Sequence, residues 1–141
     1  MKALAFALVW AAALLAGQSA VAQDDPVAEA VLDYMDFATM TQGIILPEQI
    51  DRTVFEAATF VDVRGPGEYA AEQIPGAINI GWRELPRRLG ELPASGPVIV
   101  YCDTGMRSSQ AMFAARLLGH ENVLVIGTGL QGWKARAAYT P

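Results

Sequence analysis

Cysteine and histidine are nearly absent from this chain. Its 141 residues include one cysteine, Cys102, and one histidine, His120. A single cysteine excludes an internal disulfide, and one cysteine with one histidine cannot supply the spaced set of ligands that a zinc site requires. The sequence therefore predicts no metal and no cofactor. His120 follows a predicted helix in a turn and is expected to be a solvated loop residue.

Basic residues are also scarce. The chain has 10 lysines and arginines against 15 acidic residues, which gives a formal net charge of −5 at pH 7. Beyond Arg83, Arg87 and Arg88 there is no cluster of positive charge. A nucleic-acid partner is therefore not expected, because binding to a phosphate backbone depends on a basic surface.

The first 22 residues have the pattern of a secretory signal peptide. Lys2 precedes an uncharged apolar stretch over residues 3–16, and Ala20-Val21-Ala22 is a small-x-small cleavage motif. The pattern predicts cleavage before Gln23, export to the periplasm and no membrane attachment afterwards. The alternative is an uncleaved membrane anchor, which is less favoured because the apolar stretch is short for a bilayer span.

The remaining sequence predicts a helical extension over residues 23–42 and one domain over residues 43–141. In that domain, apolar runs alternate with helix-like patterns, and the runs are continuous instead of alternating between apolar and polar residues. This is typical of an α/β fold with a central, mainly parallel sheet of about five strands and helices on both faces. The predicted strands are 43–46, 59–63, 77–80, 97–101 and 123–126, and the predicted helical segments are 47–50, 68–73, 82–89, 108–118 and one containing Trp133.

Cys102 stands where such a sheet binds ligands. It follows the predicted strand 97–101 and opens a loop that contains Gly105 and Arg107 before the next helix. A loop of this kind directs backbone N–H groups and the positive end of a helix dipole inward, which favours a reactive thiolate. A buried structural cysteine is the alternative. The coincidence of glycine, arginine and strand-loop-helix order favours a nucleophile in an anion-binding loop.

Three separate blocks, at residues 60–80, 98–108 and 127–133, together resemble the rhodanese family of sulfurtransferases. The first contains Phe60-Val61-Asp62-Val63-Arg64, Glu68-Tyr69 and Ile74-Pro75-Gly76-Ala77-Ile78-Asn79-Ile80, the second is the strand and loop around Cys102, and the third is the closing glycine-rich turn with Trp133. The resemblance covers residues 43–141 and implies a single-domain, rhodanese-like fold of the exported bacterial type.

The resemblance implies that Cys102 takes sulfane sulfur from a donor, such as thiosulfate or another sulfane or persulfide, and holds it as a persulfide. The acceptor is then cyanide, a thiol or a protein. Arg107 is implied as the second catalytic residue and is expected to close the loop by binding its carbonyl groups. Ser108 is expected to cap the following helix. The implied substrate-binding loop comprises Asp103, Thr104, Gly105, Met106 and Ser108.

Two residues depart from the family pattern. Asp103 occupies a loop position where thiosulfate-using relatives often carry a basic residue. Its carboxylate is expected to repel a dianion by about 1 kcal/mol if solvated, which disfavours thiosulfate as donor. Gln73 stands before Ile-Pro-Gly, where the family usually has a histidine. We expect this change to affect only the structure.

Asp62, Arg64 and Glu68 form a second polar group. Carboxylates beside an arginine can act as acid-base machinery, but at a strand end they more often form a structural ion-pair knot, which is the expectation here.

Two alternative functions fit parts of the pattern. One is a non-catalytic rhodanese module that binds a partner or carries sulfur, because one fold hosts several functions. The other is a single-cysteine phosphatase or arsenate reductase. Four residues separate Cys102 from Arg107, as in the sulfurtransferases, whereas the phosphatase and arsenate-handling relatives carry one more.

Overall fold

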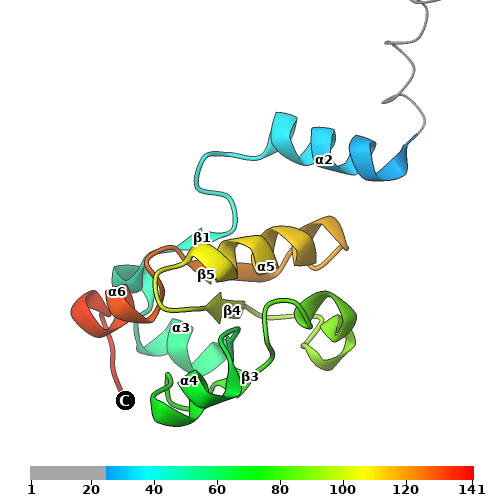
Figure 1. Ribbon diagram of the computed structural model, residues 1–141. Helices are drawn as coiled ribbons and strands as arrows, with labels where there is room; N and C mark the ends of the chain where they lie inside the picture. Colours follow the sequence, from blue (N-terminus) through cyan, green and yellow to red (C-terminus); the bar gives the residue numbers. More distant parts are fainter. Residues whose placement is uncertain (1–24) are drawn as a thin grey trace, which may run out of the picture. The chain divides into compact units, whose positions relative to one another are not determined.

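The structure is a computed structural model that describes residues 25–141 (Figure 1). The predicted signal peptide and its cleavage site lie outside the described residues. The chain separates into two units, Met1–Ala38 and Thr39–Pro141. Within the described part, no helix is both long enough and apolar enough to cross a membrane.

The first unit contributes one described helix, α2 (Pro26–Phe37), where a helix was predicted. Asp25 caps its start, because the Asp25 carboxylate accepts a hydrogen bond of 2.9 Å from the backbone N–H of Val27. Pro26 occupies the first helical position, where a missing N–H costs nothing. None of the helix residues is buried within the structure.

The second unit is built on five parallel strands in the order β1-β5-β4-β2-β3. This confirms the predicted parallel sheet. The central strands pair in register, so that Val61 lies opposite Val100, and Val100 lies opposite Val125. The strands are β1 (Ile44–Ile45), β2 (Thr59–Asp62), β3 (Ile78–Asn79), β4 (Val98–Tyr101) and β5 (Val123–Ile126).

Both faces of this sheet are covered, as the continuous apolar strands predicted. The four residues of β4 are fully buried: Val98 and Val100 join one apolar cluster, and Ile99 and Tyr101 join the other. Helix α5 (Met106–Leu117) packs on the first face. Helices α3 (Arg52–Ala57) and α6 (Gly129–Arg136) supply residues to the second cluster (Figure 1).

The predicted helix over residues 82–89 is wrong. The segment forms two short 3₁₀ turns, η2 (Leu85–Arg87) and η3 (Leu89–Glu91). Pro86 explains the difference, because inside an α-helix a proline removes one hydrogen bond and clashes with the preceding turn. The two turns still bury Leu85 and Leu89 against the sheet.

Three other helices begin at positions different from those predicted, and one of them, α5, begins at Met106 instead of Ser108. The segment at 47–50 is a 3₁₀ turn, η1 (Pro47–Gln49), and α3 follows after Asp51, whose carboxylate accepts from the N–H of Val54 at 2.9 Å. Helix α4 (Pro66–Ala71) begins with a proline two residues before the predicted start. Its position matters for the site, because it places Glu68 in the first helical turn.

Candidate active site

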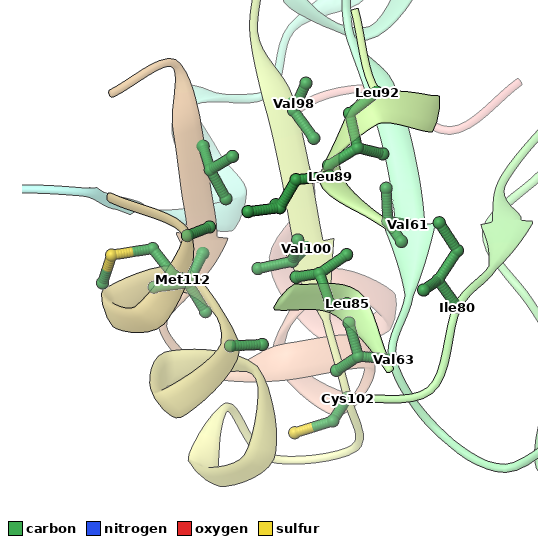
Figure 2. Close-up of a cluster of buried hydrophobic side chains, with 14 residues drawn as sticks. Val61, Val63, Ile80, Leu85, Leu89, Leu92, Val98, Val100, Cys102 and Met112 are labelled. Atoms are coloured by element: carbon green, nitrogen blue, oxygen red, sulfur yellow. The ribbon is translucent and has the colours of Figure 1, made fainter. Parts of the chain in front are cut away.

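Cys102 lies immediately after β4, at the carboxyl end of the sheet. Its side chain is 2 % exposed and belongs to the apolar cluster that covers one face. Figure 2 shows Cys102 at one end of this cluster, next to Val63. Burial alone would make a thiol inert, so its reactivity depends on the polar groups that the following loop supplies.

The loop turns back toward the sulfur at Gly105. This residue has φ +96°, and a Cβ atom there would lie 2.3 Å from the carbonyl oxygen of Gly127. Only glycine fits such a position without displacing the neighbouring backbone. The turn allows the backbone N–H groups of Thr104, Gly105 and Ser108 to donate hydrogen bonds to the sulfur of Cys102.

Ser108 does not cap the helix as expected. Helix α5 begins at Met106 with Gly105 as its N-cap, so Ser108 is already inside the first turn. Its side chain is fully buried, and its Oγ lies 3.4 Å from Cys102 Sγ and 3.2 Å from the carbonyl oxygen of Gly105. The hydroxyl therefore reaches the sulfur directly.

The pKa of the Cys102 thiol is lowered from its ordinary value by the balance of two opposing effects. Burial raises this pKa, because desolvation disfavours the thiolate. The Ser108 hydroxyl and the backbone N–H groups of Ser108, Thr104 and Gly105 lower it, and together they outweigh burial. The site thus stabilises an anionic sulfur with hydrogen-bond donors from the loop and from the first turn of α5.

Arg107 binds carboxylates instead of the expected loop carbonyls. Its Nη1 and Nη2 atoms donate to the two carboxylate oxygens of Glu68 at 3.1 and 2.8 Å, and Nη2 also donates to Asp103 at 2.7 Å. These bonds tie the loop and α5 to helix α4. Hydrogen bonds from Arg107 and from the Gly65 N–H hold the pKa of Glu68 at about 2.

Asp103 links Arg107 to a second arginine. Arg64, which is 5 % exposed, donates to Asp62 at 2.6, 2.9 and 3.1 Å and to Asp103 at 3.0 Å. The result is a continuous ion-pair chain from Asp62 through Arg64, Asp103 and Arg107 to Glu68. Of the predicted knot, Asp62 and Arg64 pair directly, whereas Glu68 joins through Arg107.

This pairing changes the interpretation of Asp103. The sequence suggested a carboxylate at the mouth of the loop that repels a dianionic donor. In the structure each of its oxygens accepts from a guanidinium, Oδ1 from Arg64 and Oδ2 from Arg107. Asp103 therefore holds the loop in place through both arginines, and the chain of three carboxylates and two guanidiniums keeps one net negative charge.

Sequence reasoning missed the support that α6 gives to the loop. The backbone N–H of Leu130 donates to the carbonyl oxygen of Cys102 at 2.7 Å. The backbone N–H of Gln131 donates to the backbone carbonyl oxygen of Asp103 at 3.1 Å. Gly129 allows this approach, since it has φ +61° and a Cβ atom there would lie 2.5 Å from the Cys102 carbonyl oxygen. The two glycines at the start of α6, Gly127 and Gly129, were the available signal.

The other candidate residues lie outside this network. Thr104 and Met106 are exposed on the outer side of the loop, and Met106 retains 75 % of its accessible surface. His120 is half-buried between α5 and β5. Among residues 25–141, no three His, Cys, Asp or Glu side chains come together in a way that could hold a metal ion.

Comparisons with known proteins agree with this geometry. Residues 46–136 match the family described as the rhodanese-like domain. A sulfurtransferase of Allochromatium vinosum is 35% identical over 78 residues, which cover 55% of this chain and 73% of that protein. The thiosulfate sulfurtransferase PspE of Escherichia coli is 36% identical over 72 residues, 50% of this chain and 69% of that protein.

Solved structures show the same fold. The structure of a human single-domain sulfurtransferase superimposes with a TM-score of 0.60 at 26% identity, covering 67% of this chain and 96% of that one. The family match spans the whole sheet except β1 and includes the cysteine loop and the turn before α6. The chain therefore belongs to the rhodanese-like domain family.

Proposed function

We propose that this protein is a rhodanese-type sulfurtransferase that carries sulfane sulfur on Cys102. One observation carries the proposal: the Cys102 sulfur stands at the end of a parallel strand, the Ser108 hydroxyl donates to it at 3.4 Å, and the backbone N–H groups of Thr104, Gly105 and Ser108 lower the pKa of its thiol. Such donors stabilise a thiolate and equally a persulfide anion, and they need no general base. The sulfurtransferases among its relatives support the same assignment.

With thiosulfate as donor, the loading step is a displacement at sulfur. The Cys102 thiolate attacks the sulfane sulfur, an Sγ–S bond forms, and the S–S bond of thiosulfate breaks. Sulfite leaves with the bonding electron pair. The enzyme then holds a persulfide with one negative charge, and charge is conserved because a dianion enters and a dianion leaves.

Discharge regenerates the thiolate. A nucleophilic acceptor, cyanide or a thiolate, attacks the terminal sulfur, and the electron pair of the Sγ–S bond returns to Cys102. The products are thiocyanate or a new persulfide. The N–H groups that lower the pKa of the Cys102 thiol act on the sulfur to which this electron pair returns.

The proposal includes export. Residues 1–22 have the pattern of a secretory signal peptide. We place the reaction in the periplasm, where the donor and acceptor are small sulfur compounds or an exported protein.

Turnover tests the proposal. The protein is incubated with thiosulfate or inorganic polysulfide and cyanide, and thiocyanate is measured. We expect catalytic formation of thiocyanate by the parent protein and none by Cys102→Ser, because a serine hydroxyl is not ionised at neutral pH. Absence of turnover with both donors would contradict the assignment and favour a partner-binding module, and hydrolysis of a phosphate ester would favour a phosphatase.

A further inference from the structure

A cavity of about 530 Å³ opens beside the ion-pair chain. Residues of the segments 63–68 and 79–88 line it together with Arg107, whereas none of residues 102–106 does. Cavities of about 300 to 1,000 Å³ hold small organic molecules. The cysteine loop therefore does not account for this space, which is large enough for a ligand of its own.

Most of the positive charge in the lining is already paired. Four arginines line the cavity, and three of them each bind two carboxylates of the domain. These pairs are Arg64 with Asp62 and Asp103, Arg107 with Glu68 and Asp103, and Arg88 with Glu84 and Glu91. The three guanidiniums are thus held by the protein's own anions.

Arg83 is the lining arginine without such a partner. It is exposed, and no carboxylate among residues 25–141 pairs with it. The carbon at the centre of its guanidinium lies 4.1 Å from the centroid of the Trp82 ring. Stacking of this kind orients the plane of a guanidinium and leaves its N–H edge available. That edge can bind a carboxylate through two parallel hydrogen bonds.

The cavity also has apolar surface that the domain holds in place. Trp82 and Pro66 line it, and neither is fully buried. Trp82 packs against the buried cluster on one face of the sheet, and Pro66 begins helix α4. Both positions are set by the fold, so the apolar wall is formed before any ligand binds.

The acidic residues of the lining limit the charge that a ligand can carry. Glu68 and Glu84 also line the cavity. A second negative charge on a ligand would meet their carboxylates, while Arg83 offers a single unpaired positive charge. One carboxylate on an apolar body therefore matches the lining better than a dianion does.

We propose that this cavity binds a small organic monocarboxylate, whose carboxylate pairs with Arg83 and whose apolar body lies against Trp82 and Pro66. The inference concerns binding only. It does not rest on the proposed transfer of sulfur.

The test measures binding in Cys102→Ser, in which sulfur chemistry plays no part. The probe is phenylpropanoate, and phenylpropanamide is its uncharged counterpart of nearly the same shape. Each is titrated into isotope-labelled protein, and its dissociation constant is obtained by NMR from the shift of the Trp82 indole N–H resonance, which Trp82→Phe identifies.

Three further variants are made in the same background. Arg83→Gln removes the unpaired charge, and Arg83→Lys retains a charge without the planar guanidinium. Arg87→Gln removes a neighbouring exposed charge that does not line the cavity, and serves as the matched control.

We expect phenylpropanoate to bind about tenfold more tightly than the amide, the effect of one charge-assisted hydrogen-bonded pair. This preference should disappear in Arg83→Gln, persist in weaker form in Arg83→Lys and remain complete in Arg87→Gln. Equal dissociation constants for the two compounds, no binding of either, or a preference that survives Arg83→Gln would overturn the inference. Thiocyanate formation by the parent protein is measured separately, so none of these outcomes bears on the proposed sulfurtransferase function.

Discussion

Cys102 and Ser108 show how a buried thiol becomes reactive. Desolvation alone would keep the thiol protonated, and the lowered pKa results from donors that point at Sγ from the loop and from the first turn of α5. Ser108 has one hydroxyl proton and two acceptors within reach, Cys102 Sγ and the Gly105 carbonyl oxygen. Ionisation of the thiol places a negative charge on Cys102 Sγ. The hydroxyl proton of Ser108 is therefore drawn to the sulfur when the thiolate forms.

Ser108→Ala should therefore shift the pKa of the Cys102 thiol upward. Thiol alkylation and sulfur loading require the thiolate, so the rising limb of each pH profile should move to higher pH. The rate of loading at pH 7 should fall about tenfold or more, since a hydrogen bond to a charged group contributes about 1.5 to 3 kcal/mol and 1.4 kcal/mol is a factor of ten. The measurement is alkylation rate against pH.

Ser109→Ala is the matched control for this experiment. Its hydroxyl binds the same Gly105 carbonyl oxygen at 2.7 Å, so this variant disturbs the loop without removing a donor to the sulfur. Equal pH profiles for the two variants would show that Ser108 acts through the loop backbone and not on the thiol.

Site residues that are close together along the chain could be recognised from the sequence. Cys102, Gly105 and the four-residue spacing to Arg107 could be recognised because they are adjacent along the chain. Two of the ion pairs could not, because the Arg64–Asp103 and Arg107–Glu68 bonds each join residues 39 positions apart. The repulsion expected from Asp103 therefore did not take Arg64 into account.

At the scale of elements, the cysteine loop is held from three sides. Arg64 follows β2, Glu68 belongs to α4, and the first N–H groups of α6 bind the loop carbonyls. Asp103 contributes to two of these attachments. The loop therefore owes its shape to the elements around it as much as to its own glycine.

Asp103→Ala should loosen the loop and leave one nitrogen of buried Arg64 without its partner. We expect a loss of about 1 to 3 kcal/mol in the free energy of unfolding, the usual cost of an unsatisfied buried group. Sulfur loading should also slow, and the factor should be similar for the two donors, thiosulfate and polysulfide. Denaturant unfolding and both loading rates, measured over a range of salt concentrations, provide the test.

Glu56→Ala serves as the control for Asp103→Ala, because Glu56 pairs with Arg52 on the exposed surface of α3 and its removal should change stability by less than about 0.5 kcal/mol. A selective increase in the thiosulfate rate of Asp103→Ala, greatest at low salt, would instead restore a repulsive role for this carboxylate.

The strands could be predicted because each is a continuous apolar run, and their burial on both faces follows from that composition. The segment 82–89 could not be assigned correctly from apolar spacing. Leu85 and Leu89 are four residues apart, as on a helix face, and both are buried, but Pro86 prevents the helix and two 3₁₀ turns place the leucines instead.

At the scale of the whole molecule, the described chain consists of helix α2 in one unit and the rhodanese-like domain in the other. The cavity, the ion-pair chain and Cys102 all belong to the second unit. The features that we propose for sulfur transfer and for ligand binding are thus contained in residues 39–141.

Export is a prediction for the full chain. Expressed with its own N-terminus in a Gram-negative host, the protein should be recovered from the soluble periplasmic fraction beginning at Gln23, because Ala20-Val21-Ala22 is a signal-peptidase motif. N-terminal sequencing and intact mass will establish the start. An intact Met1 in the membrane fraction would indicate an anchor instead.

The most direct test of the central claim is the intact mass of the protein after exposure to a sulfur donor. The parent protein, incubated with thiosulfate or polysulfide and desalted, should gain the mass of one sulfur atom, located at Cys102 by peptide mapping and lost again on addition of cyanide. Cys102→Ser should gain none. An unchanged mass with both donors, or a gain that persists in Cys102→Ser, would contradict sulfur transfer through Cys102.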